Sequence, residues 1–318
     1  MIKRTVKRAL RRMGYQMSRA APGAPPPQQP SGPPDPLVRE PKVPHGHYYS
    51  PYPDLHKIES RKDVIFDRNR KVLDIDLNED HQLKLLSAIF EMVKDVDIPV
   101  EQTPSRRYYS NNNWYAELDG LVLHFMIRTL RPKRILEVGS GFSSAMTLDT
   151  NERFFNNSIE CTFIEPHPAD RLTGLLRADD NSRVIVENLE SVDVGIFDAL
   201  KAGDFLMIDS SHVSKCDSDV NHIFFEILPR LNSGVHIHFH DIFFPFEYPS
   251  DWIYEMLSWT ECYMLRAFLM NNNDYEINFF WHMMLNKHGT LIRENLKGYL
   301  RNEGGSNIWI QKIGKPAS

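Results

Sequence analysis

Five short apolar, β-rich runs follow one another through the middle of the chain, with helical or polar segments between them. A strand that alternates with a helix predicts a parallel sheet covered on both faces. The segment 218–231 is one such helix, and it ends at Asn-Ser-Gly. The five runs are RILEVGS (134–140), CTFIEP (161–166), SRVIVE (182–187), DFLMIDS (204–210) and VHIHFHD (235–241).

Further elements flank this core on both sides. Apolar residues at helical spacing predict helices over 78–95 and 115–131. After residue 250 we expect a long helix over about 251–271, a strand near 275–281 and a last strand over 307–313. No apolar run approaches the roughly 18 residues that a membrane-spanning helix needs.

The N-terminal region differs in composition from the rest. Residues 1–20 contain seven arginines and lysines and no acidic residue, and their apolar residues form one helical stripe. Such a basic amphipathic segment can lie on an anionic membrane surface, dock on another protein or stay solvated. It has no apolar core of the kind found in export signals. Residues 21–55 are proline-rich and predict a disordered linker, so the folded domain is expected over 56–318 with a helical lead-in.

Charge and cysteine usage narrow the setting of the protein. The net charge is −5, so the chain after residue 20 carries −12, which argues against a nucleic-acid partner. Cys161, Cys216 and Cys262 are odd in number, widely spaced and without a zinc pattern. We read them as reduced thiols and expect a cytoplasmic protein, for which peripheral contact with the inner face of the membrane through the basic N-terminus stays open. The oligomeric state is left open.

The turn after the first predicted strand is rich in glycine. Glu137, Gly139 and Gly141 belong to LEVGSGFSS (136–144), where glycines let the backbone pass close to a ligand. A dinucleotide-binding turn would carry a third glycine, but Ser144 stands there. Glu165 ends the next strand, 24 residues after Gly141, about where an acid that binds ribose belongs.

These residues resemble the class I S-adenosylmethionine-dependent methyltransferases, whose first motif is E/D-x-G-x-G. The resemblance covers roughly residues 115–313. It implies a Rossmann-like α/β fold with a seven-stranded, mostly parallel sheet, and S-adenosylmethionine as cofactor. The implied cofactor residues are Gly139 and Gly141 at the methionine part, Glu137 at the loop or the amino group, Ser143 or Ser144 at the carboxylate, and Glu165 at the ribose hydroxyls.

Acidic residues and histidines follow the fourth and fifth predicted strands. Asp209 and His212 belong to IDSSH, and His240 and Asp241 end HIHFHD. Parallel strands bind ligands beyond their carboxyl ends, so both groups should face one cleft. Transfer of a methyl group to a hydroxyl needs a base or a bound cation, because a hydroxyl is a poor nucleophile at neutral pH.

This layout is similar to the metal-dependent sugar O-methyltransferases of the macrocin O-methyltransferase type. That resemblance implies His212 as base, with Asp209 and Asp241 orienting a saccharide or a glycosylated small molecule. It also implies a Mg²⁺ site, here formed by Asp209, His240 and Asp241. His240 stands where the branch has an acid, and nitrogen ligands are unusual for Mg²⁺. A softer divalent ion, a weaker site and no metal therefore stay open.

Other interpretations stay open or are less favoured. His236 and His238 should point to the same face as His240 but lie within the sheet, as hydrogen-bonded core residues. Residues 108–120, with Trp114 and Tyr115, and the loop 243–252 are candidates for the acceptor pocket. The main rivals are a silent cofactor-binding scaffold and an N- or C-methyltransferase. A nicotinamide-dependent oxidoreductase and a zinc hydrolase fit the motifs less well.

Overall fold

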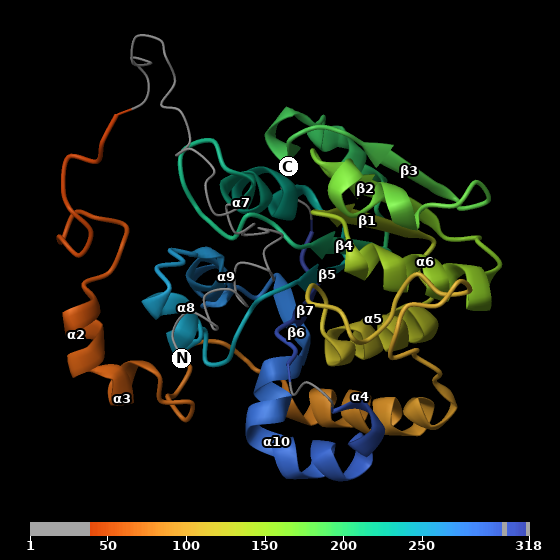
Figure 1. Ribbon diagram of the computed structural model, residues 1–318, viewed down its shortest axis with the longest axis horizontal. Coiled ribbons are helices and arrows are strands. Elements are labelled where there is room, and N and C mark those ends of the chain that lie inside the picture. The colour runs from red at the N-terminus through yellow and green to blue at the C-terminus, as the bar shows by residue number, and fades with distance from the viewer. Residues whose placement is uncertain (1–38, 301–303, 316–318) are drawn as a thin grey trace, which may run out of the picture. The chain divides into compact units, whose positions relative to one another are not determined.

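The computed structural model describes residues 39–300 and 304–315 of the 318 residues (Figure 1). The basic segment 1–20 and most of the linker 21–55 lie outside the described residues. The described chain divides into two compact units, and residues 39–65 and 250–258 belong to the smaller one. Within it, α2 (Leu55–Ser60), α3 (Lys62–Ile65) and α8 (Ser250–Tyr254) are short helices.

The larger unit, 66–249 with 259–318, contains a seven-stranded sheet in the order β3-β2-β1-β4-β5-β7-β6. β7 runs antiparallel to both of its neighbours, β5 and β6, and all the other strand pairs are parallel. This confirms the expected Rossmann-like, seven-stranded, mostly parallel sheet. The strands are β1 (Arg134–Val138), β2 (Glu160–Ile164), β3 (Ser182–Ile185), β4 (Phe205–Ile208), β5 (His236–Phe239), β6 (Tyr275–Phe280) and β7 (Ile308–Lys312).

The strand order changes direction next to β1. From β1 the chain builds outward through β2 and β3, and then returns to place β4 and β5 on the opposite side of β1. The crevice outside the carboxyl ends of strands at such a reversal is where open α/β sheets bind ligands. The residues that follow β1, β4 and β5 therefore share one edge of the sheet.

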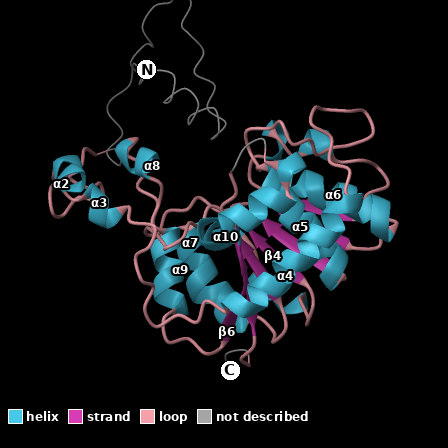
Figure 2. Cartoon of the chain, turned by 90° about the horizontal axis from the view of Figure 1, so that it is seen from below, coloured by secondary structure: helices cyan, strands magenta, loops and turns pink. Residues whose placement is uncertain are grey.

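Helices pack beside the sheet and bury their apolar side chains. α4 (Glu79–Met92), α5 (Glu117–Leu130) and α6 (Phe142–Phe155) pack in sequence, and Figure 2 shows them beside the magenta strands. Eleven consecutive residues of α5 are buried, from Glu117 to Ile127, so the helix is enclosed on all sides except at its last turn. α10 (Trp281–Asn295) follows β6 and contacts α4.

The remaining helical segments are short. α7 (Asp219–His222) continues as a π-helical turn over Ile223–Ile227 and a 3₁₀ turn over Leu228–Arg230, which together correspond to the helix predicted over 218–231. Other 3₁₀ turns span Val93–Asp95, Pro168–Asp170, Thr173–Leu175, Leu189–Ser191, Val194–Ala199 and Lys297–Tyr299. None of the described helices is long and apolar enough to cross a bilayer.

The single long helix predicted over 251–271 is wrong. The chain forms α8 and, separately, α9 (Glu261–Leu269). Met256 adopts a left-handed backbone conformation with φ +62°, which a continuous helix cannot contain. α9 begins at a tertiary contact, because the N–H groups of Thr260 and Glu261 both donate to the carbonyl oxygen of His212.

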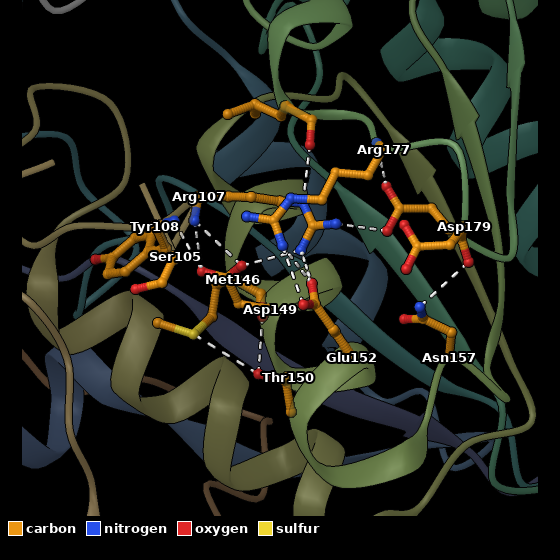
Figure 3. A network of polar contacts seen from close by, with 12 residues as sticks. Ser105, Arg107, Tyr108, Met146, Asp149, Thr150, Glu152, Asn157, Arg177 and Asp179 are labelled. Atoms are coloured by element: carbon orange, nitrogen blue, oxygen red, sulfur yellow. Dashed lines mark hydrogen bonds and ion pairs between the residues drawn. The ribbon is translucent and has the colours of Figure 1, made fainter. Parts of the chain in front are cut away.

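A buried polar network ties the segment before α5 to α6 and to the loop after β2 (Figure 3). Arg107, whose side chain is 3% exposed, pairs with Asp149, Glu152 and Asp180 at 3.1, 2.7 and 2.6 Å. Glu152 also pairs with Arg177 at 2.7 Å. Each buried charge in this network has an opposite partner, which is the condition for burying charge without a large loss of stability.

Candidate active site

The glycine turn after β1 approaches the end of β4 too closely for a side chain. Gly139 has φ +76°, and a Cβ atom there would lie 1.8 Å from the carbonyl oxygen of Asp209. Beside this turn, the carboxylate of Glu165 accepts hydrogen bonds from the N–H of Ser140 at 3.1 Å and of His167 at 2.8 Å. The backbone thus holds the Glu165 carboxylate next to the glycine turn.

Glu137 lies beneath this turn and is 1% exposed. Burial raises the pKa of Glu137 to about 8. The hydrogen bonds that the hydroxyls of Ser143 and Ser144 donate to its carboxylate act in the opposite direction and lower this pKa. Ser144 also accepts from the N–H of Gly141 at 3.0 Å and so closes the first turn of α6. The hydroxyls of Ser143 and Ser144, predicted for the cofactor carboxylate, are engaged by Glu137 instead.

Ser140 was not among the predicted site residues. It is 2% exposed, and its hydroxyl has no hydrogen-bond partner among the residues that the structure describes. Burying a hydroxyl without a partner costs free energy, so such a group is often completed by a ligand or a water. Its place between two glycines of the motif was the signal that could have found it.

Beyond β4 and β5 the structure brings Asp209, His212 and Asp241 together. The Nε2 atom of His212 lies 3.4 Å from Oδ1 of Asp209 and 3.9 Å from Oδ2 of Asp241. His212 and Asp241 both have left-handed backbones, with φ +62° and +54°. Such conformations cost of order 1–3 kcal/mol and concentrate at functional sites. The Asp209 and Asp241 side chains keep 33% and 18% of their surface exposed.

The other side of the His212 ring is held by Glu261, which the sequence did not reveal. Its Oε2 lies 2.8 Å from Nδ1 of His212, and its Oε1 accepts from the hydroxyl of Ser210 at 2.8 Å. Trp259 covers the ring, with centroids 4.3 Å apart. Burial acts to lower the pKa of His212, but the hydrogen bonds to Asp209 and Glu261 outweigh burial and hold this pKa well above its usual value.

His240 lies behind these groups and is 5% exposed. Its Nε2 is 3.6 Å from Oδ1 of Asp241, and its ring centroid is 5.0 Å from that of Tyr115. Burial opposes its protonation, but Asp241 and Asp209 outweigh burial and raise the pKa of His240. Burial also acts to raise the pKa of Asp209, but the charge at His240 and the hydrogen bond to His212 lower it to about 2. The cluster therefore combines carboxylates with histidines that favour the protonated form.

The predicted metal ligands do not fit a bound cation. Among the residues that the structure describes, no group of three or more His, Cys, Asp or Glu side chains is arranged to hold a metal ion. The Nε2 atom of His212 lies within 4 Å of a carboxylate oxygen of both Asp209 and Asp241, so both carboxylates already face an imidazole.

The two inner histidines of β5 lie in the core. His236 is 8% exposed and its Nδ1 is 3.1 Å from the amide oxygen of Asn278. His238 is 1% exposed, lies 3.5 Å from the hydroxyl of Tyr115 and contacts the ring of Trp309. Burial, together with the nearby His240, holds the pKa of His238 well below its usual value. These rings sit inside the sheet and not at its edge.

The predicted acceptor segments separate into buried and accessible parts. Tyr115 is 1% exposed, and the Asn112 side chain is taken up by main-chain groups of its own turn. Trp114 is partly exposed and stacks with Arg171, whose Cζ lies 4.9 Å from the indole centroid. In the loop 243–249, Tyr248 is buried and its hydroxyl accepts from the N–H of Cys262. Trp114 is thus partly exposed and Arg171 exposed, whereas Tyr115 and Tyr248 are buried.

A family model described as "Methyltransferase domain" matches residues 136–242, which include the glycine turn, Glu165 and both strand-end groups. The chain therefore carries a methyltransferase domain, on a seven-stranded, Rossmann-like sheet. An uncharacterized protein of Archaeoglobus fulgidus is 38% identical over 164 residues, which are 50% of this chain and 73% of that protein.

Two solved structures are similar to this methyltransferase at low identity. The O-methyltransferase TomG of Streptomyces achromogenes, in complex with SAM, is 14% identical with a TM-score of 0.39. The match covers 73% of this chain and 90% of TomG. The SAH-bound methyltransferase PaMTH1 of Podospora anserina is 13% identical with a TM-score of 0.42, covering 81% and 96%.

The residues of the methyltransferase's turn fit the cofactor. Gly139 leaves no room for a side chain between the turn and β4, so the backbone itself forms the surface. Glu165 is held by two N–H groups beside this surface, and Ser140 offers a hydroxyl without another partner. The carboxylate of Glu165 suits the hydroxyl groups of a ribose. The Ser140 hydroxyl, beside the glycine turn, suits a polar group of the amino-acid part.

Proposed function

We propose that this methyltransferase transfers a methyl group from S-adenosylmethionine to a hydroxyl of a saccharide or a glycosylated small molecule. One observation carries the proposal. The His212 imidazole is held between the buried carboxylate of Glu261 and the partly exposed carboxylates of Asp209 and Asp241, beyond the carboxyl ends of β4 and β5. A histidine with a buried carboxylate on Nδ1, and with Nε2 facing two partly exposed carboxylates, has the arrangement of a general base.

The cofactor residues lie on the neighbouring strands. Glu165 would bind the ribose hydroxyls, and Gly139 and Gly141 would border the methionine part. When bound, the cofactor supplies an electrophilic methyl group on a sulfonium. What remains for the protein is to position the acceptor oxygen and to remove its proton. β1 and β4 are adjacent in the sheet, so the two sets of residues share one crevice.

The base acts through the two nitrogens of His212. Nε2 would accept the proton of the acceptor hydroxyl, while Glu261 fixes the tautomer and stabilises the imidazolium that forms. Because the pKa of His212 is raised, the free enzyme favours the protonated ring near neutral pH. A positive charge nearby, such as the sulfonium, favours the neutral ring. We therefore expect the rate to rise with pH.

The carboxylates favour an acceptor with several hydroxyls. Asp209 and Asp241 accept hydrogen bonds and can hold hydroxyl groups on either side of Nε2. Trp114 adds a partly exposed aromatic face of the kind on which sugar rings stack. An amine acceptor would be cationic near neutral pH. It would have to lose a proton before it could attack the methyl group, unlike a neutral hydroxyl whose proton His212 can take.

The test is an acceptor screen in which formation of S-adenosylhomocysteine is measured with free sugars, nucleotide sugars and glycosylated small molecules. With an active acceptor, His212→Ala should lower kcat by about 10²–10⁴-fold, the usual contribution of a general base. His81→Ala, at an exposed position in α4, is the matched control and should keep the full rate. Full activity of His212→Ala, or a product methylated on nitrogen or carbon, would contradict the proposal.

A further inference from the structure

Arg171, in the loop after β2, reaches over the glycine turn. Its Nε and Cζ lie 3.8 and 4.0 Å from the position that a Cβ atom at Gly141 would take. Its guanidinium also stacks on Trp114, with Cζ 4.9 Å from the ring centroid. Within the described residues Arg171 forms no ion pair, although its side chain lies close to a turn that fits the cofactor.

The loop that carries Arg171 is anchored firmly. Leu172 is fully buried, and the carbonyl oxygen of Leu175 accepts from Nε of Arg107 at 2.8 Å. Further along, Arg177 joins the network of Figure 3 through Glu152. Buried contacts thus fix the loop, and stacking on Trp114 places the Arg171 guanidinium at the turn.

Three donors meet at this turn. They are the Arg171 guanidinium, the hydroxyl of Ser140 and the N-terminus of the 14-residue helix α6, which begins at Phe142. The Ser140 hydroxyl is buried and has no hydrogen-bond partner among the described residues. This points to a ligand independently of the helix N-terminus. A cation, a free donor and the positive end of a helix together favour a negatively charged group.

We propose that Arg171, backed by Trp114, binds the carboxylate of the methionine moiety of S-adenosylmethionine, together with Ser140 and the start of α6. The proposal rests on the assignment of the cofactor. It replaces the role that the sequence suggested for Ser143 and Ser144, whose hydroxyls Glu137 engages. An acidic acceptor is the other source of a carboxylate at this place, and the experiment separates the two.

The experiment compares two cofactors that differ only in this carboxylate. The full chain is titrated calorimetrically with S-adenosylmethionine and with decarboxylated S-adenosylmethionine, as wild type, Arg171→Ala and Arg171→Lys. We expect Arg171→Ala to weaken binding of S-adenosylmethionine by about 10- to 100-fold, the usual loss for a charged hydrogen-bonded pair. Binding of the decarboxylated compound should stay equal or become tighter, because a nearby positive charge has been removed. Arg171→Lys should lie between wild type and Arg171→Ala.

The matched control is Arg134→Ala, at the opposite end of β1, where the side chain is 42% exposed and pairs with Glu160. It should change neither affinity. An equal loss for both cofactors in Arg171→Ala would show that Arg171 only supports the loop and would overturn the proposal. Unchanged binding of both, with a raised KM for an acidic acceptor, would assign the arginine to the acceptor and would also overturn it. Wild-type protein that binds neither compound would refute the cofactor assignment itself.

Discussion

Replacing Glu261 by glutamine should change how tightly His212 holds its proton. The change keeps the shape of the side chain but removes the negative charge that lies 2.8 Å from Nδ1 in a fully buried position. A hydrogen bond to a charged group is worth about 1.5–3 kcal/mol. The proton affinity of His212 should therefore fall by about 10- to 100-fold, and its titration midpoint should move to lower pH by about one to two units.

The titration can be followed without knowledge of the acceptor. Protein with ¹³C-labelled histidine would be titrated by NMR, and the His212 signal assigned by its loss in His212→Asn. Once an acceptor is known, the rise of kcat/KM with pH should move in the same direction, while the maximal rate falls because the ring loses its fixed orientation. Glu226→Gln makes the same chemical change at an exposed position and should leave the midpoint in place.

An unchanged or raised midpoint in Glu261→Gln would refute this reasoning. The raised pKa of His212 would then have to come from Asp209 and Asp241 alone. In that case Asp209→Asn should lower the midpoint instead. If the midpoint falls in both variants, the carboxylates of Glu261 and Asp209 raise the pKa of His212 jointly.

Four further predictions follow from contacts elsewhere in the site and fold. Gly139→Ala should destabilise the protein by about 3 kcal/mol or more in urea unfolding, because its Cβ would overlap the carbonyl oxygen of Asp209 and its φ is positive; a loss under 1 kcal/mol would contradict this. Glu165→Ala should abolish micromolar binding of S-adenosylmethionine in calorimetry without loss of folding, and retained affinity would reject its ribose role. Arg107→Ala should cost about 3–5 kcal/mol in urea unfolding, since it leaves Asp149 and its neighbours buried without their cation; a surface-like effect would mean the network opens to water. Treatment with EDTA should leave methyl transfer unchanged, and activity that returns only with Mg²⁺ would restore the metal hypothesis.

Local patterns in the sequence were enough to predict the sheet. The parallel strands β1, β2, β4 and β5 each lie within a short apolar run, because parallel strands are buried on both faces and leave a continuous apolar signature. The glycine turn was equally readable, since a left-handed φ at Gly139 and contact with β4 both exclude a side chain. The long helix over 251–271 failed because the break before α9 depends on hydrogen bonds to the His212 carbonyl, which lies far away in the chain.

The site itself was only partly visible in the sequence. Asp209, His212 and Asp241 could be placed at one edge because strand ends of a parallel sheet coincide. Their chemistry could not be read in the same way. A histidine beside two carboxylates suits a metal site or a base equally well, and the choice depends on what lies on the far side of the ring.

What the sequence determined by itself is the class of fold, the glycine turn and the edge where ligands bind, because these depend on periodicity and on residues close in the chain. What only the tertiary structure decided is which side chains touch. Glu261 reaches His212 from 49 residues away, and Arg171 reaches the glycine turn from the loop after another strand. Hydrogen bonds and charge effects act over a few ångströms in space. Contacts between segments far apart in the chain therefore leave no local pattern from which they can be read.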